Sequence, residues 1–393
     1  MSAHATTHSH DHHHHHDDVV YPATIPFVLV HLACFAVIWT GFTTTAIVMA
    51  VVLYVVRMWA LTAGFHRYFS HRSYKTSRWF QFVLAFLGQT SAQRGVIWWS
   101  ALHRHHHRHS DTPEDVHSPV HGGFFHAHVG WIFKPKRTEA DYSTVKDLTQ
   151  YPELRFLDKH PYFPAFLLAV ACFLIGGWPG LIVGFFWSTV ALFHGVFLIN
   201  SMAHGIGKQR YVTGDESRNN WLLALVTLGE GWHNNHHHYQ SSTRQGFRWW
   251  EIDISYYVLK MLAAFRLVWD LREPPAAIVN GEQRLGRKVI EKVADDLTWS
   301  FPLEALGARV RDAWQHKPSL VELRGRAETA RTDLAARLSE VHVPDFPTRD
   351  ELTHRAREMY RNAPSVDDIV DRADEIIRET VARYALQEAR ASR

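Results

Sequence analysis

The sequence predicts an all-α integral membrane protein with four transmembrane helices in two hairpins, a cytoplasmic helical cap and a soluble helical C-terminal appendage. Two observations predict this class: the apolar residues gather in four long blocks arranged as two pairs, and 30 of the 393 residues are histidine. The two cysteines, Cys34 and Cys172, allow at most one disulfide and exclude a thiolate zinc site. A net charge of +3 is too balanced to indicate a nucleic-acid partner.

The apolar blocks cover residues 25–40, 43–63, 163–177 and 179–199. A membrane helix needs about 20 predominantly apolar residues, a length that the second and fourth blocks reach. The first and third are shorter and would need Tyr21, Tyr162 or Trp178 as interface anchors. Arg57 lies near the end of the second block, where we expect it to snorkel to the surface. Buried helices of a soluble α protein are the alternative interpretation.

The short connectors predict the membrane topology. Residues 41–45 and 176–180 contain no Lys or Arg, whereas the segments on the other side contain several. By the positive-inside rule, the basic side is the cytoplasm, and both termini lie there. We therefore expect a multi-pass protein whose active site is also cytoplasmic. Residues 79–99 are apolar but interrupted by Gln89, Gln93 and Arg94, so we expect an interfacial or cap helix there.

The two ends of the chain differ from its middle. Residues 1–18 contain eight histidines and no core-forming residues, so a disordered tail is expected over residues 1–20, which could bind metal only loosely. Residues 21–275 form the expected membrane domain. Residues 276–393 form the expected cytoplasmic helical appendage, in which apolar residues between Val366 and Val381 recur at helical spacing. This appendage is typical of docking or self-association and carries no recognisable chemistry.

Nine of the other 22 histidines fall into four clusters, two of which directly follow a spanning block. Positions i, i+3 and i+4 share one face of a helix, so the histidines of the second and of the last cluster converge, and Asn200 and His204 project together. All four clusters fall on the cytoplasmic side of the predicted topology. The residues concerned are His66 and His71; His103, His106 and His107; Asn200 and His204; and His233, His236 and His237.

Nine neutral imidazoles are too many for one ion, so the pattern predicts two metal ions in the cap. Imidazole suits iron, copper, zinc and nickel alike, and ligand type alone does not decide between them. A membrane setting with ligands that permit redox chemistry favours iron. The sequence has no Glu-x-x-His pair of the kind that provides bridging carboxylates in ferritin-like bundles.

Three segments resemble the histidine boxes of the membrane-bound Δ9 fatty acyl desaturases. The first is Thr62-Ala63-Gly64-Phe65-His66-Arg67 with Ser70-His71-Arg72-Ser73-Tyr74. The second is His103–His107 with Ser110-Asp111, Gly123-Phe124-Phe125 and His128-Val129-Gly130-Trp131. The third is Gly229-Glu230-Gly231-Trp232-His233-Asn234-Asn235-His236-His237. Asn200-Ser201-Met202-Ala203-His204 is similar to the family's additional ligand segment, with Met202 in place of a common alanine. The resemblance covers residues 26–266.

The resemblance implies that all nine histidines are iron ligands and that Asn200 acts through a bound water. It implies that Asp111 and Glu230 orient ligand imidazoles, as carboxylates near metals commonly do. Five further histidines are expected to support the site or to lie on the surface: His105, His109, His126, His128 and His238.

The implied reaction is O2-dependent insertion of a cis double bond, at the Δ9 position, into a saturated fatty acyl chain carried as a thioester or in a lipid. The implied cofactors are two Fe²⁺ ions, with O2 as co-substrate and an apolar tunnel for the acyl chain. Because the chain contains no recognisable flavin or nicotinamide site, an external donor of ferredoxin, rubredoxin or cytochrome b5 type is expected. The lipid bilayer is the remaining partner.

Two other functions remain open. A di-iron membrane hydroxylase of alkyl or lipid substrates would use the same ligands, although Asn200 and His204 speak against it. A non-enzymatic membrane metal-binding protein would place its ligands within the spans, whereas these lie beyond them. Within the desaturase interpretation, Met58 lies eight residues before His66 and is expected to cap the tunnel and limit the length of the acyl chain.

Overall fold

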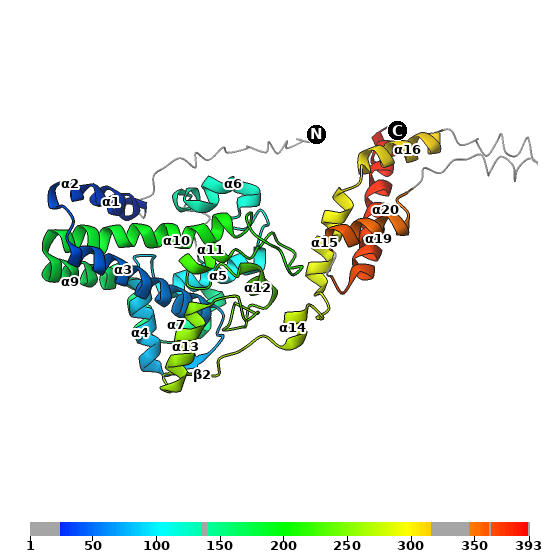
Figure 1. Ribbon diagram of the computed structural model, residues 1–393. Coiled ribbons are helices and arrows are strands. Elements are labelled where there is room, and N and C mark those ends of the chain that lie inside the picture. Colours follow the sequence, from blue (N-terminus) through cyan, green and yellow to red (C-terminus); the bar gives the residue numbers. More distant parts are fainter. Residues whose placement is uncertain (1–23, 135–139, 316–345, 361–362, 392–393) are drawn as a thin grey trace, which may run out of the picture. The chain divides into compact units, whose positions relative to one another are not determined.

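The computed structural model describes residues 24–134, 140–315, 346–360 and 363–391 (Figure 1). These residues are mostly helical, with the two-residue strands β1 (Lys75–Thr76) and β2 (Val268–Trp269) paired antiparallel. The prediction of an all-α fold is therefore confirmed in its broad form. The histidine-rich tail expected at residues 1–20 lies outside the described residues.

The chain divides into two compact units. Unit 1 contains the described residues up to Gly207 together with Arg218–His236 and Gln240–Glu273. Unit 2 contains Lys208–Ser217, His237–Tyr239 and the described residues from Pro274 onward.

Along the chain, the apolar helices of unit 1 come in two pairs, and a short turn joins the two members of each pair. Gly41 and Gly177 end the first helix of each pair with positive φ angles of 67° and 59°, a conformation that glycine adopts without steric cost. After the second turn, the π-helix η7 packs against α9, and the chain continues into α10 (Figure 1). The first pair comprises α1 (Ile25–Ala33), η2 (Cys34–Ala36), α2 (Val37–Thr40), α3 (Thr44–Trp59) and the π-helix η3 (Ala60–Ser70). The second comprises α9 (Phe163–Pro179), the π-helix η7 (Gly180–Trp187) and α10 (Ser188–Met202).

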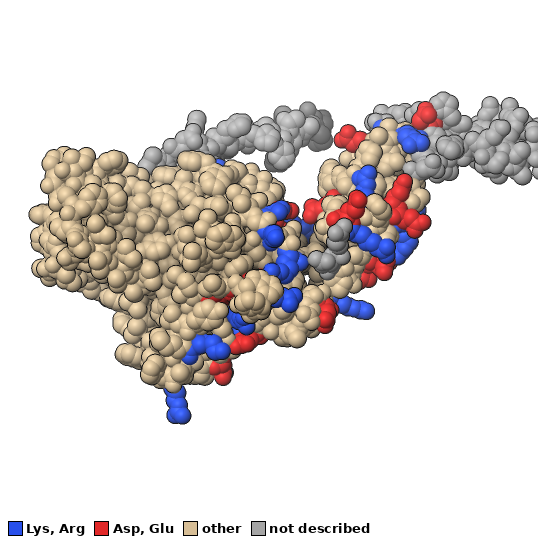
Figure 2. All heavy atoms as spheres, in the orientation of Figure 1, with Lys and Arg blue, Asp and Glu red and all other residues tan. Residues whose placement is uncertain are grey.

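Two helical stretches are long and apolar enough to cross a bilayer, Thr44–Ser70 and Phe163–Met202. The kink at Gly177 divides the second stretch, and the apolar Ile25–Thr40 stretch is shorter. Large apolar side chains on these helices point outward, among them Trp39, Leu174 and Ile175. In Figure 2 this part of unit 1 displays almost no Lys, Arg, Asp or Glu. Such a surface is typical of contact with lipid.

Arg57 does not snorkel, so that prediction is wrong. Its side chain is 1% exposed, and its guanidinium donates hydrogen bonds to Thr189 Oγ1 (2.8 Å), Ser188 Oγ (2.5 Å) and the carbonyl of Thr90 (3.4 Å). Because hydroxyl and carbonyl oxygens of neighbouring helices accept its protons, the guanidinium does not have to reach water. Arg57 thereby joins α3 to the start of α10.

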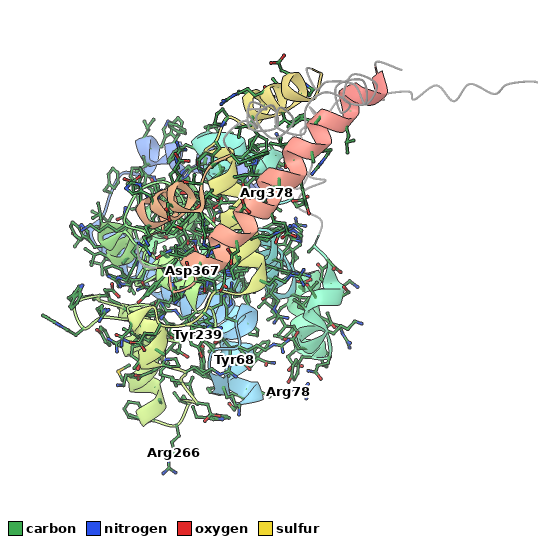
Figure 3. All side chains as sticks on the ribbon, turned by 90° about the vertical axis from the view of Figure 1, so that its right-hand side faces the viewer. Tyr68, Arg78, Tyr239, Arg266, Asp367 and Arg378 are labelled. Carbon is green, nitrogen blue, oxygen red and sulfur yellow. The ribbon has the colours of Figure 1, made fainter. Side chains whose placement is uncertain are left out.

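The cap of unit 1 packs around η3, and residues 78–89 form one of its helices. The main core contains Phe65, Leu84, Ile97, Leu154 and Leu259, which come from five different helices. Arg266, just after α13, points away from this core (Figure 3). The cap helices are α4 (Arg78–Gln89), α5 (Val96–His109), α6 (Pro119–His128), η4 (Gly130–Phe133), η6 (Tyr142–Val145), α7 (Lys146–Thr149), α8 (Pro152–Lys159), α11 (Trp221–Val226), α12 (His233–His238) and α13 (Ile254–Ala264).

Unit 2 has a hydrophobic core of its own, which includes Leu297, Leu352, Ile369, Val370 and Ile377. The helical spacing found in the sequence from Val366 onward corresponds to α20. The helices are α14 (Ala276–Asn280), α15 (Arg287–Trp299), α16 (Leu303–Gln315), α19 (Arg349–Met359) and α20 (Val366–Ala391).

Candidate metal centre

Four segments of the fold carry the nine candidate ligands. His66 lies in the π-helix η3 and His71 directly follows it, while His204 follows the end of α10. The others lie on α5 (His103, His106 and His107) and on α12 (His233, His236 and His237). A π-helical segment is a frequent feature of functional sites, because its extra residue re-aims the side chains that follow.

The first group of ligands contains His66, His71, His103, His107 and His236, whose ligand nitrogens all lie within 4.8 Å of one another. The Nε2–Nε2 distances are 2.8 Å for His71 and His103, 3.0 Å for His66 and His236, and 2.9 Å for His107 and His236. Two nitrogens bound at right angles to one ion, at about 2.1 Å each, lie about 3 Å apart. The spacing of these nitrogens therefore fits a shared metal ion.

The second group contains His106, His204 and His233, with His237 one turn after His233 on α12 as its fourth member. Nε2 of His204 lies 3.0 Å from Nε2 of His233, and all four side chains are buried. His106 and His107 belong to different groups because consecutive residues of a helix point in different directions. The sequence predicts two ions, and in the structure the nine imidazoles fall into two groups.

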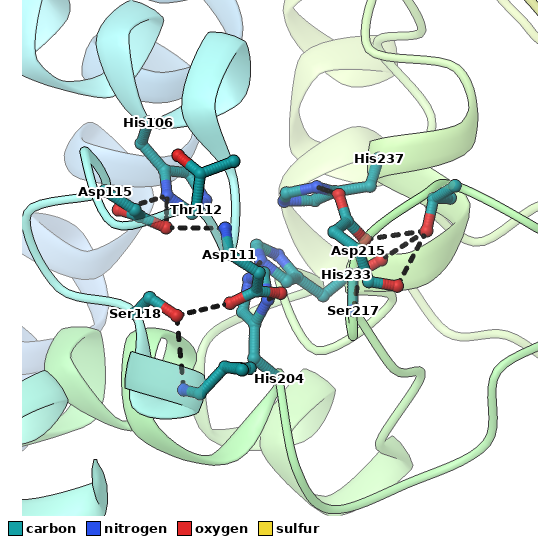
Figure 4. A network of polar contacts seen from close by, with 12 residues as sticks. His106, Asp111, Thr112, Asp115, Ser118, His204, Asp215, Ser217, His233 and His237 are labelled. Atoms are coloured by element: carbon teal, nitrogen blue, oxygen red, sulfur yellow. Dashed lines mark hydrogen bonds and ion pairs between the residues drawn. The ribbon is translucent and has the colours of Figure 1, made fainter. Parts of the chain in front are cut away.

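Four carboxylates contact the outward-facing Nδ1 atoms of these ligands. The distances are 2.6 Å from Glu230 to His66, 2.8 Å from Asp111 to His204, 3.1 Å from Asp115 to His106 and 2.7 Å from Asp215 to His237. Figure 4 shows the three aspartates with their histidines. Glu230 and Asp111 were expected in this role. Asp115 and Asp215 were missed because they lie in irregular loops, where periodicity gives no information about direction. In the sequence they are marked only by their position a few residues after a candidate ligand, Asp115 after His107 and Asp215 after His204.

The carboxylates determine which nitrogen each ring offers to a metal. An Nδ1–H that donates to a carboxylate leaves the Nε2 lone pair free to bind an ion. Burial raises the pKa of the Glu230 carboxyl, but His66 and Arg67 oppose this effect and lower it to about 2. Burial likewise raises the pKa of Asp115, while His106 and His117 lower it far below its ordinary range. Both groups are therefore anionic at neutral pH.

Arg67 holds the first box and the third box together. Its buried guanidinium donates to Glu230 Oε1 at 2.9 and 3.0 Å, to Asp253 Oδ1 at 2.9 Å and to the carbonyl of Thr243 at 2.9 Å. Asp253 in turn caps α13 by accepting from the backbone N–H of Tyr256. One cation thus compensates two buried anions and fixes the carboxylate that orients His66.

A mostly apolar cavity of about 990 Å³ reaches the ligands and continues between the apolar helices. His103 and Asn200 lie in its wall, and the α10 side is lined in succession by Asn200, Phe197, Phe193 and Phe186. Met58 is buried in the core and is not part of the lining. The prediction that Met58 caps the cavity is therefore wrong, whereas Phe185 and Phe186 on η7 do line it.

The expected supporting histidines have local partners. Nε2 of His105 contacts the carbonyl of Glu114 and Nε2 of His126 that of Val116, while His109 stacks on His105. His128 contacts Ser201 and His194, and His238 stacks on Tyr211.

His117 is a residue that the sequence reasoning missed. It is buried, lines the cavity, and its Nδ1 lies 3.6 Å from Asp115. Burial lowers its pKa to about 3, so it is neutral at physiological pH.

The fold and the site define a helical protein with an apolar outer surface and with histidine clusters that could hold metal ions next to an apolar cavity. The chain belongs to the fatty acid desaturase family, whose model matches residues 39–269. It is accordingly an oxidoreductase of lipid metabolism, and its apolar helices indicate a membrane protein.

Similar curated proteins include desaturases of two kinds of acyl carrier. An sn-1 stearoyl-lipid 9-desaturase of Anabaena variabilis is 36% identical over 63% of this chain and 92% of its own length. An enzyme of the same description from Synechocystis is 38% identical over 63% of this chain and 79% of its own length. An acyl-CoA 5-desaturase of Anemone leveillei is 37% identical over 62% of this chain and 77% of its own length.

Proposed function

We propose that this chain is an O2-dependent desaturase that introduces a cis double bond at the Δ9 position of a saturated acyl chain, using two iron ions held by histidine. The observation that carries the proposal is the apolar cavity that ends at His103 and Asn200 beside nine convergent imidazoles. Because an alkyl C–H bond is inert to acid–base chemistry, the reaction needs a metal and oxygen rather than a side-chain base.

In this proposal His66, His71, His103, His107 and His236 bind one iron ion, and His106, His204, His233 and His237 bind the other. Asn200 acts through a bound water. The donor set fits iron because it contains only neutral nitrogen ligands, each presented by its Nε2 atom. The two reduced irons supply O2 activation when bound, for which the protein side chains have no equivalent.

The remaining steps belong to the protein. The wall of the cavity holds one pair of methylenes beside His103 and Asn200, which converts a bimolecular encounter into a positioned one. The apolar side chains of Trp98, Phe193 and Phe197 exclude water from the reacting carbons. The carboxylates of Glu230 and Asp111 hold His66 and His204 in the tautomer that a metal needs.

The position of the double bond is assigned by analogy. Two of the similar proteins act as 9-desaturases on stearoyl lipids, which favours the Δ9 position, whereas the acyl-CoA relative acts at position 5. The acyl carrier in this proposal is a thioester or a lipid.

The proposed setting is a bilayer crossed by four helices, with the metal centre and both termini in the cytoplasm. The support is the absence of Lys and Arg from the connectors at 41–45 and 176–180. Two electrons per turnover come from a ferredoxin, rubredoxin or cytochrome b5 type donor that docks on the cytoplasmic face.

The test is expression in a host that lacks its own desaturase, followed by mass spectrometry that locates double bonds in the acyl chains. We expect cis double bonds between carbons 9 and 10, and none with the His106→Ala variant. Hydroxylated chains without double bonds would instead identify a hydroxylase. Unchanged chains from a metal-loaded, reduced protein would point to a metal carrier.

A further inference from the structure

The cavity opens on the lipid-facing side of unit 1. Two residues of its wall, Leu29 on α1 and Phe166 on α9, are 57% and 63% exposed, so the wall continues to the outer surface at this point. The exposed neighbours along the same helices, such as Leu32 and Val170, are apolar as well. A molecule that enters between α1 and α9 therefore comes from the hydrocarbon region of a bilayer rather than from water.

Helix α1 forms one side of this opening and separates the cavity from the outer surface by a single helix. It contributes Pro26, Phe27, Leu29, Val30 and Ala33 to the cavity wall, yet it contains no buried residue. On the opposite side, the lining positions from Asn200 to Phe186 extend over about 20 Å of helix. The cavity thus has an extended apolar wall that runs from the metal ligands into the membrane segment.

The wall also contains polar groups suited to an ester and a phosphate. Within the described part of the chain, Nε2 of Gln93 is buried without a hydrogen-bond partner. The neighbouring Arg94 guanidinium stacks over the Trp98 ring at 4.3 Å and forms no ion pair with a described carboxylate. Tyr142 and Tyr162, both partly exposed, add two phenol groups to the same wall. Phenols, a guanidinium and an amide are the groups that meet lipid head groups at a membrane interface.

The wall of the cavity carries one positive charge that could bind a phosphate. Arg94 is the single Lys or Arg among the described lining residues. A phosphodiester needs one such partner, and the guanidinium of Arg94 can supply it.

We infer that the substrate is an acyl chain still esterified to a membrane glycerophospholipid, which enters sideways between α1 and α9. Arg94 binds the lipid phosphate, Gln93 donates to the ester carbonyl, and the chain extends along α10 past His103. This inference rests on the proposed desaturase function and names its substrate class.

The experiment uses the full-length, iron-loaded protein in lipid nanodiscs with O2 and a reductant. Deuterated stearoyl chains are supplied either within phosphatidylglycerol of the disc or as stearoyl-CoA from solution, and mass spectrometry measures the double bonds formed in each pool. We expect desaturation of the phospholipid pool. Equal or faster desaturation of stearoyl-CoA would overturn the inference while leaving the proposed function intact. Desaturation of neither pool would remove the proposed function and the inference with it.

One matched pair of variants tests the opening itself. Leu29→Trp fills the mouth and should lower phospholipid desaturation at least about tenfold, whereas Leu32→Trp, on the same helix and 56% exposed but outside the lining, should leave it within about twofold. Both should keep the iron content of the unmodified protein. Equal activity of the Leu29→Trp and Leu32→Trp variants would contradict entry between α1 and α9.

Arg94→Gln should raise the mole fraction of phosphatidylglycerol needed for half-maximal rate by about tenfold, with little change in the maximal rate. Arg94→Lys should restore most of this loss. Arg155→Gln, an exposed cation outside the cavity wall, is the control and should have no effect. A change in maximal rate alone would show that Arg94 does not bind the lipid.

Discussion

Nδ1 of His66 lies 2.6 Å from a carboxylate oxygen of Glu230, and the other oxygen of that carboxylate accepts hydrogen bonds from the buried guanidinium of Arg67. His66 and Arg67 are adjacent in the first box, whereas Glu230 belongs to the third. This contact therefore links two segments that are far apart in the sequence, and it fixes the orientation of His66, a candidate metal ligand. Substitutions that remove such contacts are therefore expected to change metal affinity or stability.

Replacing Glu230 by Gln should lower the affinity of the first ligand group for a divalent metal by about 10- to 100-fold. The amide is neutral and cannot accept simultaneously from His66 and Arg67 as the carboxylate does. Titration of the metal-free protein with Co²⁺, followed by its visible absorption, measures the effect. Glu153→Gln, which removes a surface ion pair with Arg78, is the control. An unchanged Co²⁺ affinity in Glu230→Gln would mean that this carboxylate does not orient His66.

Arg104 should matter for folding as much as for the site. It donates to the carbonyls of Phe69 and Ser70, just before His71, and to Asp147, and its side chain is only 15% exposed. Arg104→Gln should lower the free energy of unfolding by about 2–4 kcal/mol, since several charge-assisted hydrogen bonds are lost. Urea titration of the protein in detergent measures this loss. Arg108→Gln, an exposed neighbour on α5, should change the value by less than about 0.5 kcal/mol. Equal effects of the two variants would exclude a special role for Arg104.

His117 should make the metal-free protein sensitive to acid. Its pKa is about 3 in the folded protein, because the ring is buried, and about 6.5 in the unfolded chain. Between these values the unfolded chain binds more protons, so the folded state loses stability as the pH falls below about 6.5, by up to about 1.4 kcal/mol per pH unit. His117→Gln should reduce this slope. Thermal unfolding of both proteins between pH 7 and pH 5.5 gives the comparison, and identical slopes would contradict the assignment.

Deleting residues 1–18 should leave two tightly bound metal ions per chain. The nine candidate ligands all lie between His66 and His237, so the histidines of the tail are not needed to complete either group. Metal analysis of the truncated protein after exhaustive dialysis is the measurement. Loss of both ions would show that the tail belongs to the site or supplies its metal.

The sequence predicts which histidines come together, but not how they divide into two groups. Spacing on a helix correctly brings His233 and His237 to one face, and it groups His103 with His107. It wrongly suggests that His106 stays with them, because the division between the two groups depends on which partners approach α5 from other helices. That information comes from the packing of α10, η3 and α12, which no local pattern contains.

Two other predictions depended on the environment of a side chain. Arg57 lies near the end of an apolar block, and the rule that such residues snorkel fails because Ser188 and Thr189 offer acceptors inside the helix group. Met58 shares a helical face with Tyr54, yet both pack close to Gly195 instead of facing the cavity. In each case the deciding atoms belong to a helix more than a hundred residues away.

The most direct test of the central claim is the iron content and product of the purified protein with single ligand substitutions. The iron-loaded protein should contain two irons per chain and form a double bond in a saturated acyl chain. His106→Ala and His236→Ala, one from each ligand group, should each bind less iron and form no product, whereas His105→Ala should retain two irons and most of the activity. Two irons and full desaturation in either His106→Ala or His236→Ala would contradict the proposed metal centre.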